Sequence, residues 1–165
     1  MQFTNVTSVE VKQAQIPHNL FVAGLFMFDL LMTPAVIALK IGMAGLFIPL
    51  IFSGSLIAWI YLRSKKKTDS WFVDSHWRLT FVRAQWLMTG YAISAALILV
   101  AWLISLASND HNIQHILWTA LTRIALMPTV IMVLITAVLE ASAIATVTKR
   151  EVPDKLVAAF PPPAA

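Results

Sequence analysis

Residues 63–67 read Arg-Ser-Lys-Lys-Lys, and this basic stretch separates two long apolar regions of the chain. Basic loops next to apolar helices stay on the cytoplasmic side of a membrane. The stretch therefore predicts how the chain sits in a bilayer, and we expect its basic side chains to contact anionic lipid headgroups. With two later arginines it holds half of the twelve Lys and Arg residues, namely Arg63, Lys65, Lys66, Lys67, Arg78 and Arg83.

The composition is that of a membrane protein. Of the 165 residues, 59% are hydrophobic and 12% are charged, and the mean hydropathy is +0.77. A soluble domain of this size could not cover so much apolar surface with so few charges. The net charge of +4 lies beside apolar segments, so we expect a lipid bilayer with anionic headgroups as the partner of the positive charge, and no nucleic acid.

Several chemistries are excluded by what the sequence lacks. The chain has no Cys, so it has no disulfide, no thiolate metal site and no Cys-ligated iron–sulfur cluster. Its few glycines form no phosphate-binding loop, and no nucleophile motif occurs. No cofactor and no catalytic residue are therefore predicted. The first eighteen residues are polar and do not resemble a cleavable signal peptide.

The first apolar region predicts two helices. Residues 20–62 are almost continuously apolar, and one membrane-spanning helix needs about 20 residues. Helices are expected at 19–39 and 43–62, with a tight break at Lys40-Ile41-Gly42 and a start near Pro17.

Prolines lie inside the predicted spans. Pro34 and Pro49 are expected to kink the first two helices without ending them, because neighbouring groups satisfy the freed carbonyls in lipid. The last helix, at 113–147, would be about 50 Å long, against about 30 Å of hydrocarbon. Either it projects beyond the membrane or Pro128 bends it.

The second half predicts two more spans and a surface helix. Tryptophans interleaved with polar residues after the basic stretch are typical of the membrane interface, and Asp74 and Arg78 are spaced as i,i+4 partners. The fold class is thus all-α, with four transmembrane helices and an interfacial amphipathic helix before the third. The expected elements are the amphipathic helix at 70–84, helices at 86–107 and 113–147, a polar loop at 108–112, and an extended Pro-rich end at 160–165.

Lys and Arg counts set the expected orientation. The loop between the second and third helices carries six, the C-terminal segment three, the first hairpin one and the 108–112 loop none. We therefore expect both termini and the basic loop in the cytoplasm. The expected organisation is a cytoplasmic segment at 1–18, a transmembrane domain at 19–147 and a cytoplasmic tail at 148–165.

Charged residues inside the spans are candidate functional residues. Asp29 and Arg123 both fall near the expected midplane, where an isolated charge is costly, so they are predicted to pair. Glu140 is expected to pair with Arg83 or Arg78 at the foot of the third helix. For all of these a structural ion pair and a role in an ion or proton path stay open.

Four histidines give two candidate cofactor sites. His111 and His115, spaced i,i+4 beside Asp110, could share a metal ion, or Asp110 and its neighbours could simply cap a helix. His18 and His76 both lie near the expected cytoplasmic interface and could hold a haem between them. For both sites an ordinary structural role is the alternative.

Small residues recur at helical spacing. Such rows let helix backbones approach closely, either within the bundle or against the helix of a partner. They are Ala137, Ala141 and Ala145 in the last helix, and Gly90 and Ser94 in the third.

The segment Trp71-Phe72-Val73-Asp74-Ser75-His76-Trp77-Arg78 follows the basic loop and leads into an apolar helix. In this it resembles a family of small uncharacterised bacterial inner-membrane proteins, which share a basic loop, then Trp, then Ser-His-aromatic-Arg. The resemblance covers roughly residues 60–105. It implies a compact bundle of three or four helices in a bacterial inner membrane, and it implies no activity.

These observations lead to an expected function. We expect a non-catalytic accessory subunit of a larger bacterial inner-membrane complex, such as a respiratory or energy-transducing one, with an integral-membrane partner or a second copy of the chain. The alternatives are a haem- or metal-binding redox protein linked to quinone and a small ion or solute conductor.

Overall fold

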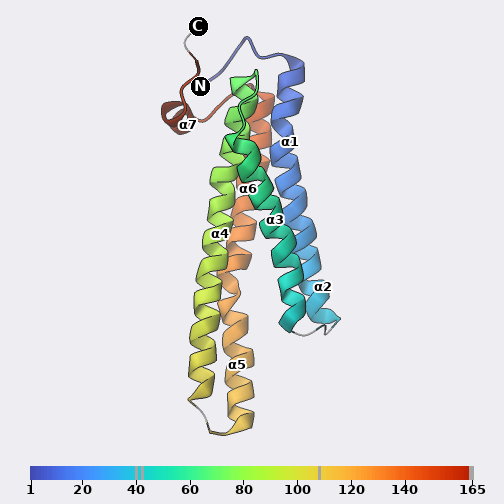
Figure 1. Cartoon of the computed structure of the whole chain (residues 1–165), viewed down its shortest axis with the longest axis vertical. Coiled ribbons are helices and arrows are strands. Elements are labelled where there is room, and N and C mark those ends of the chain that lie inside the picture. Colours follow the sequence, from blue (N-terminus) through green and yellow to red (C-terminus); the bar gives the residue numbers. More distant parts are fainter. Residues whose placement is uncertain (40, 42, 108, 164–165) are drawn as a thin grey trace. The chain divides into compact units, whose positions relative to one another are not determined.

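The computed structural model describes residues 1–39, 41, 43–107 and 109–163, and its regular structure is almost entirely helical (Figure 1). The elements are α1 (Ser8–Gly24), the π-helix η1 (Leu25–Met32), α2 (Thr33–Ala38), the 3-10 helix η2 (Met43–Leu46), α3 (Phe47–Lys65), α4 (Trp71–Leu106), α5 (His111–Ala125), α6 (Met127–Thr148) and α7 (Asp154–Ala159). The predicted break at 40–42 and the loop at 108–112 fall partly on Lys40, Gly42 and Ser108, and the predicted end of the tail falls on 164–165, all outside the described residues.

Four helices are long and apolar enough to cross a membrane, which confirms the predicted number of spans. They run over Ser8–Ala38, Ala44–Lys65, Trp71–Leu106 and His111–Thr148. Large apolar side chains on them are exposed, such as Ile51 at 63%, Leu99 at 56% and Val138 at 70%. Apolar exposure on this scale suits helices whose surroundings are lipid.

The first helix begins earlier than predicted. Thr7 and Glu10 form a capping box, in which the Glu10 N–H donates to Thr7 Oγ1 at 3.3 Å and the Thr7 N–H donates to Glu10 Oε2 at 2.8 Å. This reciprocal bonding satisfies the first helical donors, so α1 starts at Ser8. Pro17 consequently lies inside the helix and not at its start.

Two prolines coincide with local changes in helix geometry. Upstream of Pro34 the helix takes the wider π register over Leu25–Met32, and the Thr33 hydroxyl donates to the Phe28 carbonyl at 3.1 Å. Pro128 follows an interruption at Leu126, where α5 ends and α6 begins, because a proline cannot donate to the preceding turn. Pro49 differs from the prediction, since it lies in the first turn of α3, where its missing N–H has no helical partner.

The amphipathic helix predicted at 70–84 leads directly into the third span without a break. Residues 71–106 form one helix, α4, and the side chains from Phe72 to Trp77 are buried. No Gly or Pro interrupts this region before Gly90. At 1.5 Å per residue, 36 residues extend about 54 Å, so the excess over about 30 Å of hydrocarbon matches the polar first part of α4.

The partners predicted for Asp74 and Arg78 also change. Asp74 accepts hydrogen bonds from the backbone and hydroxyl of Thr68 at 2.7 and 2.8 Å, which holds the basic loop against the start of α4. The Arg78 guanidinium lies 3.5 Å from the ring centre of Phe160, which also stacks on Trp71. The chain before the Pro-rich end is therefore anchored to α4.

The chain divides into two compact units. The first comprises Met1–Ala84 and Ala137–Ala165, and the second comprises Gln85–Thr136. In the second unit α4 and α6 pack closely, because Thr129 Oγ1 donates to Ser94 Oγ at 2.8 Å and to the Gly90 carbonyl at 3.3 Å.

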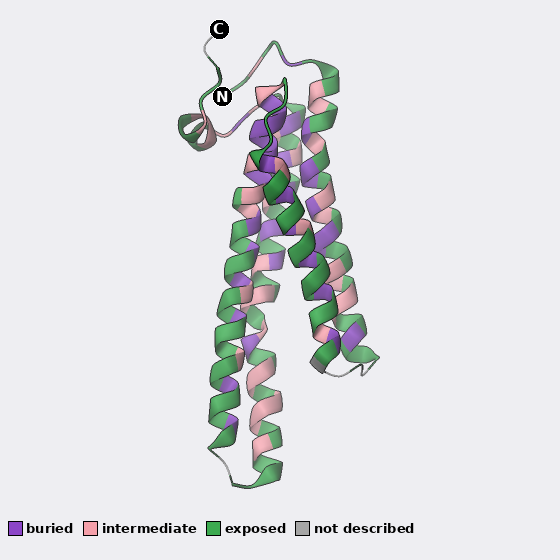
Figure 2. Cartoon of the chain, viewed as in Figure 1, coloured by how far each residue is buried: buried purple, intermediate pink, exposed green. Residues whose placement is uncertain are grey.

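The ends of the chain pair within the first unit. The Met1 ammonium donates to the Val152 carbonyl at 2.9 Å and to Asp154 at 2.7 Å, and Gln2 bridges to Glu151. Val152 is fully buried. Figure 2 shows that buried residues also gather where α1, the start of α4 and the end of α6 run together, and this is where the polar side chains discussed next lie.

Candidate functional site

The core of the first unit contains a buried polar network from three helices. Its members are His18 of α1, His76 and Thr80 of α4, and Glu140 of α6, and all four are 0% exposed. Arg83 of α4, which is partly buried, lies at its edge. Polar side chains are rarely buried so completely unless they bind one another, so their contacts define the site.

Helical spacing explains why these residues meet. His76, Thr80 and Arg83 follow one another at i, i+4 and i+7, which places them on one face of α4. On α6, Glu140 belongs to a buried row with the same spacing. On α1, His18 lies on the buried side with Pro17 and Phe21. The α6 row is Val133, Thr136, Glu140, Ala143 and Val147.

His18 is the central member, because both of its ring nitrogens are engaged. Its Nδ1 lies 2.5 Å from Glu140 Oε2, and its Nε2 lies 3.0 Å from His76 Nδ1. The Thr80 hydroxyl donates to the His76 carbonyl at 3.1 Å and presents its oxygen to His18 Nδ1 at 3.0 Å. The two imidazole rings meet edge to face at 81°. A continuous chain of hydrogen bonds therefore runs from His76 through His18 to Glu140.

Arg83 supplies the positive charge beside the carboxylate. Its Nη1 lies 3.7 Å from Glu140 Oε1 and also donates to the Leu139 carbonyl. A buried carboxylate without a partner is strongly unfavourable, and a guanidinium and an imidazole N–H together offset that cost. Arg83, one of the two predicted partners of Glu140, thus faces it, whereas Arg78 lies over Phe160.

The network ends in one buried polar atom on each side. Among the described residues, His76 Nε2 and Glu140 Oε1 are buried and have no hydrogen-bond partner. Buried polar atoms are nearly always bonded to protein or water, and the nearest groups here are the Glu151 backbone beside His76 and the Arg83 guanidinium beside Glu140. One end is a ring nitrogen that can accept a proton, and the other is a carboxylate oxygen.

The predicted haem site does not match this arrangement. The His18 and His76 nitrogens that face each other are already joined at 3.0 Å, and the other nitrogen of His18 is bound to Glu140. An iron between the rings would have to replace these bonds. The two histidines do lie together, but in contact with each other and with Glu140, and the contact with Glu140 was not foreseen.

The histidines of α5 lie in the second unit. Asp110 Oδ1 accepts the Asn112 N–H at 2.8 Å and so caps α5. His111 and His115 are exposed on the same helix. Nowhere in the described part of the chain do three His, Asp or Glu side chains form a group able to hold a metal ion. A metal site at these histidines stays a prediction.

Asp29 and Arg123 belong to different units. Asp29 lies in η1 and accepts a hydrogen bond from Ser53 Oγ of α3 at 3.2 Å. Arg123 is exposed in the last turn of α5. Their pairing stays a prediction.

The rows of small residues have different surroundings. Gly90 and Ser94 are buried, and they contact α6 within the second unit. In the last helix Ala141 and Ala145 are exposed and Ala137 is partly buried, so this row does not pack within the first unit, and its docking against a partner's helix stays a prediction. The buried face of α6 is instead the row that contains Glu140, which the sequence pattern of small residues does not reveal.

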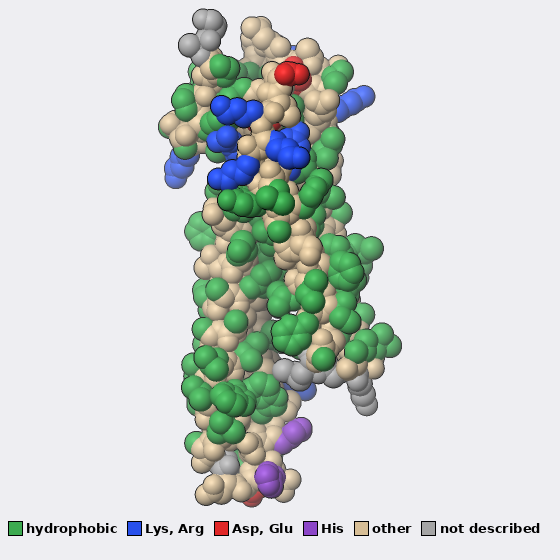
Figure 3. Space-filling view, in the orientation of Figure 1, with side chains coloured by type: hydrophobic (Ala, Val, Ile, Leu, Met, Phe, Trp, Pro, Cys, Tyr) green, Lys and Arg blue, Asp and Glu red, His purple; other side chains and the backbone are tan. Residues whose placement is uncertain are grey.

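The basic stretch ends α3 and begins the following loop. Arg63 lies 5.2 Å from the ring centre of Trp77, and Lys65 lies 5.1 Å from that of Tyr61. Lys66 and Lys67 are exposed. Figure 3 shows Lys and Arg side chains gathered at this end of the first unit, with hydrophobic side chains covering its helices beyond them. This distribution suits a membrane interface.

Sequence reasoning missed the contact of His18 with Glu140 and the part played by Thr80. The spacing of His76, Thr80 and Arg83 on one helical face was the available signal, but it looks the same on a surface helix. Comparison with known proteins adds no constraint, since the chain matches no family model, no curated protein and no solved structure.

Proposed function

We propose that the chain is a proton-binding accessory subunit of an energy-transducing complex in a bacterial inner membrane, with its basic loop and both termini in the cytoplasm. The observation that supports this proposal most strongly is the series of buried hydrogen bonds from His76 through His18 to Glu140. Ionisable groups placed in line within a membrane protein are the usual means of moving a proton. In this proposal the polypeptide supplies the proton-binding groups, and the partner supplies the reaction that uses the proton.

The hydrogen bonds allow a proton to pass by a change of tautomers. With Glu140 ionised, His18 donates from Nδ1 to the carboxylate, and its Nε2 accepts the Nδ1 proton of His76. A proton taken up at His76 Nε2 lets His76 pass its Nδ1 proton to His18 Nε2. His18 then passes its own Nδ1 proton to Glu140. The result is a neutral carboxylic acid and two neutral imidazoles with exchanged tautomers, so the one proton taken up at His76 is balanced by the one now held at Glu140.

The position of the network suits proton uptake from the side of the basic loop. His76 is near the beginning of α4 and Glu140 is in the second half of α6, and both belong to candidate spans, Trp71–Leu106 and His111–Thr148, that are longer than the hydrocarbon requires. Arg83 stabilises the ionised form of Glu140 between uptake events. The cost of holding these groups inside the protein is consistent with a functional site.

A partly exposed polar face on α5 supports the proposal of a membrane-protein partner. His115, Thr119 and Arg123 are spaced i,i+4 on a helix that is part of a candidate span, and Arg123 is exposed. Lipid is a poor environment for this face, whereas the polar side chains of a neighbouring membrane protein would satisfy it. Purification in mild detergent should retain such a protein or a second copy, and a monodisperse monomer that purifies alone would contradict this part of the proposal.

Infrared difference spectroscopy tests proton binding directly. The full chain in lipid nanodiscs is titrated, and the C=O stretch of a protonated carboxylic acid is followed. We expect a carboxyl band that grows on acidification, disappears in Glu140→Gln and persists in Asp69→Asn, in which an exposed carboxylate is removed.

The pH dependence of that band should also change in His76→Gln, because the proton acceptor at the end of the network is lost. A spectrum that is the same in wild type and Glu140→Gln at every pH would mean that Glu140 never changes its protonation. The network would then be a structural ion pair, and the proposal would be wrong.

A further inference from the structure

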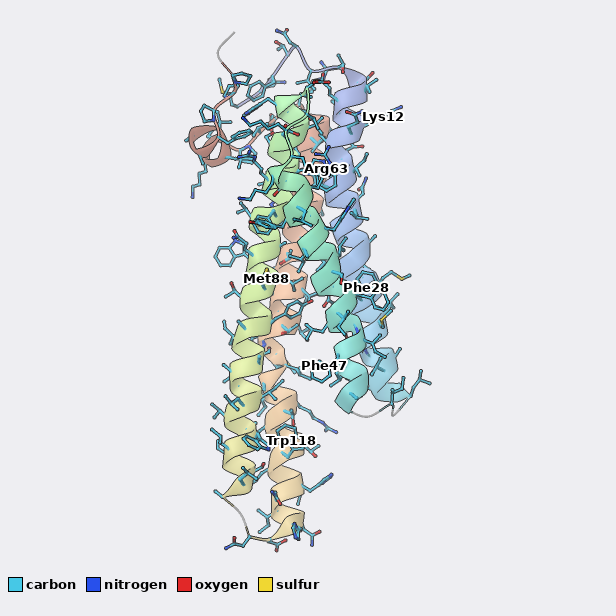
Figure 4. The ribbon with its side chains drawn as sticks, viewed as in Figure 1. Lys12, Phe28, Phe47, Arg63, Met88 and Trp118 are labelled. Atoms are coloured by element: carbon cyan, nitrogen blue, oxygen red, sulfur yellow. The ribbon has the colours of Figure 1, made fainter. Side chains whose placement is uncertain are left out.

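A cavity of about 600 Å³ lies in the first unit, between the start of α1, the end of α3 and the loop before α4. This volume is within the range of sites that bind small molecules. Its apolar wall is formed by Ile16, Val73 and Trp77. Arg63, labelled in Figure 4 near the end of α3, lies at the level where the apolar span gives way to the basic loop. The remaining polar lining residues are Glu10, Gln13, Thr68, Asp69 and Ser70.

Arg63 provides an anion-binding group in this cavity. Its Nη1 is buried and, among the described residues, has no hydrogen-bond partner, while its guanidinium is held over the Trp77 ring at 5.2 Å. A buried guanidinium donor without a partner is unusual, because arginine is well suited to binding carboxylates and phosphates through paired hydrogen bonds. A carboxylate or phosphate oxygen would satisfy this donor.

The carboxylates of Glu10 and Asp69, which line the cavity, make a simple anion an unsuitable ligand. Glu10 is occupied, because its Oε1 accepts the Ser70 hydroxyl at 2.5 Å and its Oε2 accepts from Thr7. Asp69 is exposed and lines the same cavity, so it is available to a cation. An anion alone would be repelled by Asp69 and Glu10, and a cation alone would leave Arg63 unsatisfied. A ligand that carries both charges matches both groups.

We propose that this cavity binds a phosphoester that carries a primary amine, with its phosphate at Arg63 and its ammonium at Asp69. A primary ammonium has three N–H donors for carboxylate and hydroxyl oxygens, whereas a trimethylated ammonium has none. Both phosphatidylethanolamine and its free headgroup, glycerophosphoethanolamine, carry a phosphate and a primary ammonium. The apolar wall of the cavity, and the place of Arg63 at the end of a candidate span, favour the lipid over the free headgroup.

Native mass spectrometry of the full chain in detergent tests the proposal with matched lipids. Phosphatidylethanolamine, phosphatidylglycerol and phosphatidylcholine of identical acyl chains are added at equal concentration. We expect several-fold more phosphatidylethanolamine to remain bound than either other lipid. This comparison uses the unaltered protein, so it does not depend on the folding of a variant. Equal retention of the three lipids would overturn the proposal.

Variants identify the two ends of the ligand. Arg63→Gln should lower phosphatidylethanolamine retention by about tenfold, as expected for one charge-assisted hydrogen-bonding group. Lys67→Gln removes the same charge from an exposed residue that does not line the cavity, and it should leave retention unchanged. Asp69→Asn should remove the preference over phosphatidylglycerol. Equal effects of the Arg63 and Lys67 substitutions would show that only a diffuse positive charge acts, which contradicts the site.

Competition identifies the source of the ligand. Free glycerophosphoethanolamine that displaces the bound lipid would show that the headgroup suffices and that a soluble phosphoester can occupy the cavity. Failure of the free headgroup to displace it, with lipid selectivity intact, would assign the cavity to the membrane lipid alone. Because the readout is lipid retention, its failure leaves the proton-binding proposal for Glu140 to its own test.

Discussion

Glu140 is the residue on which the buried network depends most. It accepts from His18 at 2.5 Å and faces Arg83 at 3.7 Å, and it is fully buried. Removing the acidic member of such a cluster leaves buried donors and positive charge without an acceptor. The stability of the first unit and the proton chemistry proposed for it therefore depend on the same carboxylate.

Glu140→Ala should destabilise the protein by roughly 3–5 kcal/mol, the usual effect of breaking a buried ion pair by removing one partner. Glu140→Gln should cost less, because the amide oxygen still accepts from His18. Asp69→Ala, at an exposed carboxylate, is the control and should change stability by about 0.5 kcal/mol or less. Thermal unfolding in detergent measures all three. A Glu140→Ala protein as stable as the control would show that Glu140 makes no stabilising contact.

At the scale of single helices, close approach of α4 and α6 in the second unit depends on Gly90. A Cβ atom placed there would lie 2.8 Å from Met132 Cβ and 3.3 Å from the Pro128 carbonyl oxygen. Neither neighbour is the far end of a flexible side chain, so the helices would have to separate.

Gly90→Ala is therefore expected to destabilise the protein by about 1–3 kcal/mol, the usual cost of overpacking. Gly54 of α3 is the matched control, because a Cβ there meets nothing within 4 Å. Gly54→Ala should be neutral or stabilising by up to about 1 kcal/mol, since alanine favours the helix. Unfolding of the two variants in detergent compares them. Equal stability of the two would contradict the close packing described for Gly90.

The helices also show what the sequence could and could not predict. Long apolar runs fixed the number of spans, because lipid demands about 20 apolar residues per helix. For the polar stretch at 71–84, the pattern of polar and aromatic residues predicted a helix but did not say what covers its polar face. That face contacts other polar groups here. The spacing of Thr7 and Glu10 is that of a capping box, and it was a signal for the early start of α1 that the prediction of a helix at 19–39 did not use.

At the scale of the whole molecule, the candidate site combines residues that are far apart in the sequence. His18 and Glu140 are separated by 122 positions, and His18 and His76 by 58. Their meeting depends on the rotation of α1, α4 and α6 about their axes, which composition and spacing do not determine. The individual ionisable residues could be predicted as candidate functional residues, but the hydrogen bonds that join them could not.

The contact between the two imidazole rings is the central claim, and NMR can observe it directly. The chain has four histidines, so selective ¹⁵N labelling of histidine rings gives few signals. We predict a scalar coupling across the hydrogen bond between His18 Nε2 and His76 Nδ1, absent in His76→Gln, while His111 and His115 give the signals of exposed rings. Four uncoupled rings that all exchange with solvent would contradict the buried network and the function built on it.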